Sequence, residues 1–388
     1  MHIFEMLGVW GLSIAVRKSQ SIQSLASSKM ARFRTLHSVD TNYSADSVEW
    51  CAQDGHHAYF ACGTYQLVEA EENEVTTKNR PRKGRVYLYH FDTGSGALER
   101  VQSIETAAVL DMKWLPAWSI DSGPLLATAN ALGEVEIYEL LSDEKQLQRR
   151  MCLGLTAAEP TAEAPLALAL DWQRDGDELQ LVVSDSKGNI NLLRYTPQGK
   201  LFVLSAWNAH SFEAWTCVFD RWTPHRVYSG GDDCLLQARD LRTEQLVWTN
   251  RAHQAGVTCL LSHPKHDYQL LTGSYDEQLR VFDTRMMKRS LAEVNLGGGI
   301  WRLKPHPNRA EIILAACMYN NFSVVQLDLE NSAVTMLGTY DEHSSICYGA
   351  DWNPSLSEGD GLMHMATCSF YDHKMCVSSF DLGCSQTE

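Results

Sequence analysis

The chain has 388 residues, of which 44% are apolar, so it can bury a large core. Its formal net charge at pH 7 is −15, which argues against nucleic-acid binding, because phosphate contacts need clustered lysines and arginines. An acidic surface instead suits a cationic or basic partner.

The first 30 residues differ from the rest and are predicted to be an extension outside the folded domain. Their apolar run, 3–16, is too short to span a bilayer. The basic residues Arg17 and Lys18 follow this run, whereas a secretory signal carries them in front. We therefore predict no membrane attachment. The Ser-rich segment is either a transit peptide or an upstream extension with Met30 as an alternative start.

Residues 31–388 are predicted to form one all-β domain, because a four-strand unit recurs seven times. In each unit a second apolar strand ends in small residues and a turn, and a third alternating strand often closes with Asp. Short strands separated by Gly, Asp and Asn turns, four in each ~40–45 residues, predict a seven-bladed β-propeller of WD-repeat type. The first strands of the units are 47–50, 110–114, 168–172, 216–220, 258–264, 301–307 and 348–354.

The seventh unit stops after its third strand, at Phe380 and Asp381. The segment 33–39, ahead of the first unit, is predicted to supply the missing fourth strand, which closes the ring and removes exposed edges. Two stretches fit no blade. The charged segment 69–84 is predicted to be a loop within the first blade, and 156–165 to join the second and third blades.

Neither a metal site nor a cofactor is predicted. The eleven cysteines are scattered without zinc-site spacing, and most lie in apolar runs typical of reduced core residues in a cytosolic protein. The sequence contains no P-loop, GxSxG, HExxH or Gly-rich dinucleotide motif.

Three units place a His before the first strand, an Asp in the turn between strands two and three, and a Ser or Thr on strand two. In WD-repeat blades such a set is buried and ties the blade together, since buried polar groups need partners. We favour this structural role over a nucleophilic triad. The sets are His210, Asp233 and Ser229; His253, Asp276 and Thr272; and His343, Asp372 and Thr367.

The residues beside those aspartates are predicted to point toward the central channel at one face of the ring. Each aromatic among them could instead pack between blades. Together they predict a mouth lined by rings and carboxylates, which favours a cation. The turns contribute Asp232, Tyr275 and Tyr371, and the entrances to the first strands contribute Glu213, Trp215, Trp301 and Tyr348.

Two short stretches, "ARDLR" (238–242) and "VFDTR" (281–285), resemble the box by which some WD-repeat proteins join cullin–RING ubiquitin ligases. Asp240 with Arg242, and Asp283 with Arg285, carry this match. The box is short and common, so a substrate receptor that binds a ligase adaptor is an alternative function.

Longer stretches are more specific, among them "AHSFEAW" (209–215), "VYSGGDD" (227–233), "GGIWRLKPHP" (298–307), "YGADW" (348–352) and "ATCSFYDH" (366–373). On these the chain resembles the diphthine methyltransferase family of WD-repeat proteins, now regarded as diphthine methylesterases. The resemblance runs from about residue 39 to 380 and leaves 1–30 without a counterpart.

The resemblance implies an intracellular, cytoplasmic hydrolase of diphthamide biosynthesis. Its substrate would be elongation factor 2 bearing methylated diphthine, whose methyl ester is hydrolysed to diphthine and methanol before the final amidation. The diphthine-amidating enzyme is a second expected partner. A non-catalytic scaffold that recruits this enzyme is the alternative.

A mechanism follows as a hypothesis. The aromatic residues of the mouth would cage the trimethylammonium group of the substrate, with Asp232 or Glu213 adding negative charge. A histidine or carboxylate would activate water, and His210 is the preferred base. A backbone N–H or a Tyr hydroxyl would hold the oxyanion. The sequence thus predicts His210, Glu213 and Asp232 as catalytic candidates.

Overall fold

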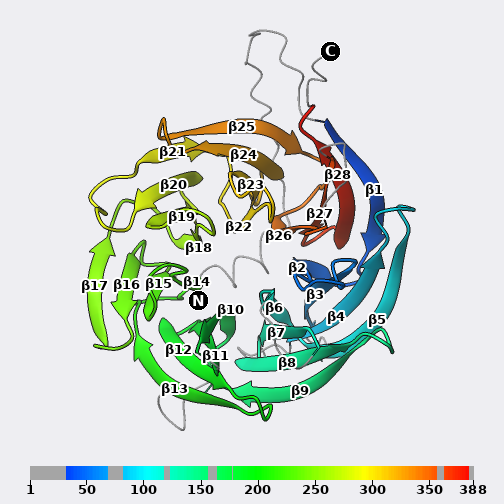
Figure 1. The fold of residues 1–388 in the computed structure, drawn as a ribbon, viewed down its shortest axis with the longest axis horizontal. Coiled ribbons are helices and arrows are strands. Elements are labelled where there is room, and N and C mark those ends of the chain that lie inside the picture. The colour runs from blue at the N-terminus through cyan, green and yellow to red at the C-terminus, as the bar shows by residue number, and fades with distance from the viewer. Residues whose placement is uncertain are drawn as a thin grey trace, which may run out of the picture.

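The computed structural model describes residues 32–68, 82–117, 123–155, 164–176, 178–355 and 362–383. These residues form seven four-stranded antiparallel sheets set as blades around a central channel (Figure 1). The prediction of a seven-bladed all-β propeller is confirmed. The predicted extension 1–30 lies outside the described residues, as do most of the segments 69–84 and 156–165. No helix in the described part of the chain is long and apolar enough to cross a membrane.

The blades follow one another in chain order, and each runs from an inner to an outer strand. Blades 1 to 3 comprise β2 (Ser44–Trp50), β3 (Tyr59–Leu67), β4 (Arg82–Phe91), β5 (Leu98–Ala107); β6 (Val109–Trp114), β7 (Leu125–Asn130), β8 (Glu134–Leu141), β9 (Gln146–Gly154); and β10 (Ala167–Asp175), β11 (Glu178–Asp185), β12 (Asn189–Tyr195), β13 (Leu201–Asn208). Blades 4 and 5 comprise β14 (Thr216–Phe219), β15 (Arg226–Gly230), β16 (Leu236–Asp240), β17 (Gln245–Asn250); and β18 (Val257–Ser262), β19 (Gln269–Ser274), β20 (Gln278–Asp283), β21 (Ala292–Asn295). Blades 6 and 7 comprise β22 (Arg302–Pro305), β23 (Ile312–Ala316), β24 (Phe322–Asp328), β25 (Ala333–Tyr340); and β26 (Cys347–Trp352), β27 (Leu362–Ser369), β28 (Lys374–Asp381), β1 (Arg32–Asp40).

The ring closes as predicted, because β1 pairs antiparallel with β28 and becomes the outer strand of blade 7 (Figure 1). Phe33 lies opposite Phe380, with the two ring centroids 4.8 Å apart, and also contacts Tyr340. The Thr35 hydroxyl lies 2.8 Å from the Tyr340 hydroxyl. The first strand of the fold therefore closes its last blade.

Apolar side chains fill the interfaces between adjacent blades in seven clusters. The strand-ending tryptophans and aspartates add hydrogen bonds between neighbouring blades, which explains their recurrence in the sequence. The indole Nε1 groups donate from Trp114 to the Glu49 carbonyl, from Trp172 to that of Lys113 and from Trp352 to that of Lys304, at 2.9 to 3.1 Å. The carboxylates of Asp111, Asp171 and Asp351 accept from the backbone N–H groups of Leu170, Phe219 and Trp50 at 2.7 to 3.0 Å.

The cysteines behave largely as predicted. None of the ten within the described residues forms a disulfide, and eight of them are buried; Cys152 is exposed and Cys234 half-buried. Cys384 lies outside the described residues.

Candidate functional site at the mouth of the channel

An eighth apolar cluster lies at one end of the channel and draws side chains from all seven blades. Its members lie near the N-terminal ends of the inner strands and in the turns between the second and third strands of the blades. They are Tyr65, Leu67, Ala108, Leu110, Ala131, Leu166, Leu168, Trp215, Tyr275, Trp301, Met318, Ile346, Tyr348 and Phe370. Since antiparallel strands alternate in direction, all these segments end at the same face of the ring. We call this cluster the mouth.

The structure brings the five aromatic residues predicted to bind substrate together at the mouth. Trp215 and Trp301 have ring centroids 5.7 Å apart, and Trp301 and Tyr348 lie 4.9 Å apart. Tyr275 contacts both tryptophans, at 6.2 Å and 6.1 Å. The Tyr348 ring contacts Phe370, and the Phe370 ring in turn contacts Tyr371. The rings form one contiguous arc from blade 4 to blade 7.

The arc has a buried floor and an exposed edge. Trp215 and Tyr348 are only 5% and 7% exposed, whereas Tyr371 is 50% exposed. Tyr319, in the turn of blade 6 between β23 and β24, is 78% exposed, and its hydroxyl acts electrostatically on Tyr275 and Tyr348. Sequence reasoning missed Tyr319, although the stretch "ACMYNN" is the turn that corresponds to those of Tyr275 and Tyr371.

Asp232 and Glu213 flank the blade 4 end of the arc. The Asp232 carboxylate accepts a hydrogen bond from Trp215 Nε1 at 3.0 Å, and its backbone N–H donates to the Glu213 carbonyl at 2.9 Å. Burial raises the pKa of Tyr275, and the negative charges of Asp232 and Glu213 add to this effect. The Tyr275 hydroxyl therefore stays protonated beside two carboxylates. The aromatic and acidic residues predicted for the mouth thus lie next to one another.

His210, the predicted base, lies inside blade 4 instead. Its Nδ1 is 2.9 Å from Asp233 Oδ1, its Nε2 is 2.9 Å from Ser229 Oγ, and its side chain is completely buried. Both ring nitrogens are thus committed to the structural set that the sequence predicts. A free nitrogen facing substrate is the first requirement for a general base, so this placement disfavours the catalytic role of His210.

The other two structural sets are also formed, one with a difference. His253 contacts Asp276 and Thr272 as predicted. His343 binds Thr367 as predicted, but its Nδ1 pairs with Ser369 Oγ at 2.6 Å rather than with Asp372. Ser369 in turn donates to Asp372, so the expected direct contact between His343 and Asp372 was wrong. In blade 7 five positions separate Thr367 from Asp372, one more than between the matching residues of the other two sets, and Ser369 bridges His343 and Asp372.

Replacing His210 with Ala is expected to lower the free energy of unfolding by about 2–4 kcal/mol, because Asp233 and Ser229 are left without their buried partner. Urea unfolding followed by tryptophan fluorescence measures this change. His266→Ala, at an exposed position, is the control and should unfold near the wild-type midpoint. An unchanged midpoint for His210→Ala would contradict the structural role.

Below the mouth, a network of charged residues crosses the channel. Arg302 of blade 6 pairs with Asp111 of blade 2 at 2.9 Å, and Lys113 contacts both Asp111 and Glu49. Lys304 joins Glu49. Burial alone would raise the pKa of Asp111, but the charges of Arg302 and Lys113 outweigh it and hold the pKa below its usual value. A cavity of about 140 Å³ adjoins this network.

Asp46 is an acid of the mouth that sequence reasoning missed. It is 4% exposed and lies in a bulge of β2, between Ala45, which pairs with Thr64, and Ser47, which pairs with Gly63. Burial raises the pKa of Asp46 to about 8, against the lowering effect of Arg302. The alignment of Trp50 with the other strand-ending tryptophans could have revealed this position, because Asp46 stands where Leu110 and Leu168 stand in blades 2 and 3.

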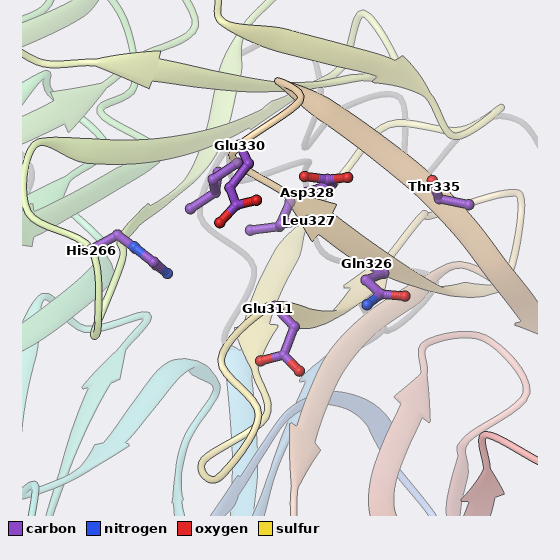
Figure 2. A pocket seen from close by; sticks show the side chains of 8 residues that line it. His266, Glu311, Gln326, Leu327, Asp328, Glu330 and Thr335 are labelled. Atoms are coloured by element: carbon purple, nitrogen blue, oxygen red, sulfur yellow. The ribbon is translucent and has the colours of Figure 1, made fainter. Parts of the chain in front are cut away.

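Two further features lie away from the mouth. A hollow of about 430 Å³ opens at the connections of β18 to β19 and β24 to β25, on the opposite face (Figure 2). Glu311, Asp328 and Glu330 give it an acidic lining (Figure 2).

Glu134, Glu136 and Cys152 gather on blade 2, but Glu136 already binds Arg149 and two hydroxyl groups. Neither feature includes a residue predicted for the site.

The two Asp–Arg boxes also lie on the face opposite the mouth, at the ends of β16 and β20. In each box the arginine pairs with its own aspartate, Arg242 with Asp240 at 2.9 Å and Arg285 with Asp283 at 2.7 Å. The arginine side chains are 63% and 64% exposed.

The closed ring of four-stranded blades defines a WD-repeat β-propeller, and residues 244–283 match the family model described as "WD domain, G-beta repeat". A chain in a crystal structure of the mitotic checkpoint complex is similar in fold, with a TM-score of 0.64 at 16% identity, covering 95% of this chain and 98% of that chain.

The chain belongs to the diphthine methyltransferase family. The diphthine methyltransferase of Mus musculus is 37% identical over 344 residues, covering 85% of this chain and 71% of the relative. That of Homo sapiens is 37% identical, covering 82% and 74%. A homolog from Dictyostelium discoideum is 32% identical, covering 87% and 96%.

Proposed function

We propose that this chain is a cytoplasmic methylesterase of diphthamide biosynthesis. It hydrolyses the methyl ester of methylated diphthine on elongation factor 2 and releases diphthine and methanol before the final amidation. The observation that carries the proposal is the mouth itself, where rings from four blades and two carboxylates meet. The names of the relatives support diphthine as the substrate.

The trimethylammonium group of the substrate suits this mouth, because ring faces and carboxylates both attract a cation. Trp215 and Tyr348 form the buried floor of the cage, and Tyr275, Trp301 and Tyr371 form its sides. Asp232 adds negative charge at one end. Burial raises the pKa of Tyr348 well above its usual value, so its hydroxyl stays protonated and is able to donate to a developing oxyanion.

Hydrolysis and methyl transfer make opposite demands on the assay. Hydrolysis consumes the ester with water alone, whereas transfer requires a methyl donor. We expect the purified chain, incubated with methyl-esterified elongation factor 2, to release methanol and shift the substrate mass down by one methylene group. Mass spectrometry measures the shift, with and without S-adenosylmethionine. Unchanged substrate without the donor, and gain of a methyl group with it, would contradict the esterase.

Two other functions use different surfaces. A scaffold that recruits the amidating enzyme to elongation factor 2 needs the mouth to bind the modified factor but leaves the ester intact. A ubiquitin-ligase receptor needs the two exposed Asp–Arg boxes, which lie on the far face. We favour the esterase over both, because neither function needs the buried acid Asp46 beside an aromatic mouth.

A further inference from the structure

We propose that Asp46 is the general base that activates water for ester hydrolysis at the mouth, an inference that rests on the proposed methylesterase function. Asp46 lies on the inner strand of blade 1 and is almost completely buried. Its charge acts on Tyr65 and Tyr348, two members of the mouth, and on Arg302 below it. Asp46 therefore lies within electrostatic reach of both the aromatic arc and the charged network of the channel.

The repeat of the fold shows how unusual this acid is. The inner strands of blades 1, 2, 3 and 7 each carry a Trp near their C-terminal end, and the other blades have an aligned residue there. The residue four positions before it lies near the N-terminal end of the inner strand, facing the mouth side of the ring. In five of the seven blades a β-bulge leaves this residue outside the ladder. The set is Asp46, Leu110, Leu168, Trp215, Thr258, Trp301 and Tyr348. Six are apolar, aromatic or hydroxyl residues, and Asp46 alone carries an ionisable carboxylate.

The other candidate general bases near the mouth already form hydrogen bonds or ion pairs. His210 uses both ring nitrogens inside blade 4, and Asp232 accepts from Trp215. Asp111 is ion-paired with Arg302 and Lys113. For the Asp46 carboxylate, by contrast, the structure shows no hydrogen bond or ion pair to another described residue that would commit it, and its pKa is set by burial and by the charges of Arg302 and Asp111. Burying a carboxyl group this deeply is costly, so its presence here calls for a function.

The acid–base chemistry of Asp46 suits a base near neutral pH. A pKa of about 8 gives a stronger base than an ordinary carboxylate and still allows ionisation at working pH. A cationic substrate lowers the pKa of a nearby acid, because opposite charges favour the ionised form. The charged or titratable groups that act on Asp46, or that it acts on, are Arg302, Asp111, Tyr65, Tyr348 and Cys368. Binding of the trimethylammonium group therefore favours the ionised, basic form of Asp46 next to the bound ester.

The reaction balances with water as the single co-reactant. The ionised Asp46 carboxylate takes a proton from water while the water oxygen bonds to the ester carbonyl carbon. A protonated Tyr hydroxyl stabilises the resulting oxyanion. The bond from the carbonyl carbon to the methoxy oxygen then breaks, and Asp46 returns its proton to the methoxide. Methanol and the free acid leave, and the acid ionises in water.

The experiment compares the full chain with Asp46→Asn, Asp46→Glu and the exposed control Asp54→Asn, using methyl-esterified elongation factor 2 and methanol release. We expect Asp46→Asn to lower kcat by about 10²- to 10⁴-fold while KM changes by less than about threefold. Asp46→Glu should restore part of the rate. The kcat/KM of the wild type should rise with pH toward 8, and Asp46→Asn should lose this dependence. Thermal melting shows that each variant is folded.

Three outcomes would overturn the inference. A folded Asp46→Asn with wild-type kcat shows that Asp46 is not the base, even though the esterase function stands. A raised KM with kcat retained shows that Asp46 only attracts the cation. If the wild type itself releases no methanol, the proposed function and the inference both fall.

Discussion

A chain that lacks residues 1–40 is expected to lose its cooperative fold or to aggregate, because β1 is the outer strand of blade 7. Removing β1 exposes the backbone N–H and C=O groups of β28, and such an open edge pairs readily with other chains. It also removes the burial of Phe33, Leu36 and Val39, which pack on the apolar clusters of the last and first blades. At up to about 2 kcal/mol for each large apolar side chain, the loss approaches the total stability of a domain, about 5–15 kcal/mol.

The matched control deletes residues 1–30 only and keeps β1, so its unfolding should match that of the full chain. Thermal melting and size-exclusion chromatography of both deletions test the prediction. A chain without residues 1–40 that remains monomeric with an unchanged midpoint would show that ring closure by β1 is dispensable. The same comparison tests the predicted boundary between the extension and the propeller.

Replacing Asp46 with Asn is expected to stabilise the protein at alkaline pH. The folded pKa of Asp46, about 8, lies above the value of about 3.9 for an unfolded aspartate. Between these two values the unfolded chain releases the proton and the folded chain keeps it, so the stability of the wild type falls as pH rises. Each pH unit in this window contributes about 1.4 kcal/mol.

From the pKa difference alone, Asp46→Asn would raise the free energy of unfolding at pH 8 by about 5 kcal/mol relative to the wild type. Burying the Asn amide costs part of this gain, so we expect a net increase of about 2–4 kcal/mol. At pH 4 both variants carry an uncharged group and should unfold at similar urea concentrations. Urea unfolding at pH 4, 6 and 8 measures the difference, which should grow with pH. A difference independent of pH would show that Asp46 does not titrate as described. Loss of activity together with gained stability is the expected signature of a functional buried acid.

Much of the site could be predicted from the sequence because it depends on local signals. Turn residues that follow a strand, such as Tyr275 and Tyr371, must lie at the same face in every blade, and the structure brings them together with Trp301 and Tyr348. The structural role of His210 was equally readable from its spacing to Ser229 and Asp233. The catalytic role of His210 stays a prediction that the geometry disfavours, because both of its ring nitrogens are occupied inside blade 4.

The sequence by itself determined the number of blades, the ring closure and five of the rings at the mouth, because strand periodicity and turn chemistry act within a single repeat. Only the tertiary structure decided which acid at the mouth is unusual. The burial of Asp46 and the charges around it come from blades 1, 2, 6 and 7, whose inner strands converge on the channel. A pKa depends on the dielectric and the charges in three dimensions, so no local pattern around Asp46 could have shown its value.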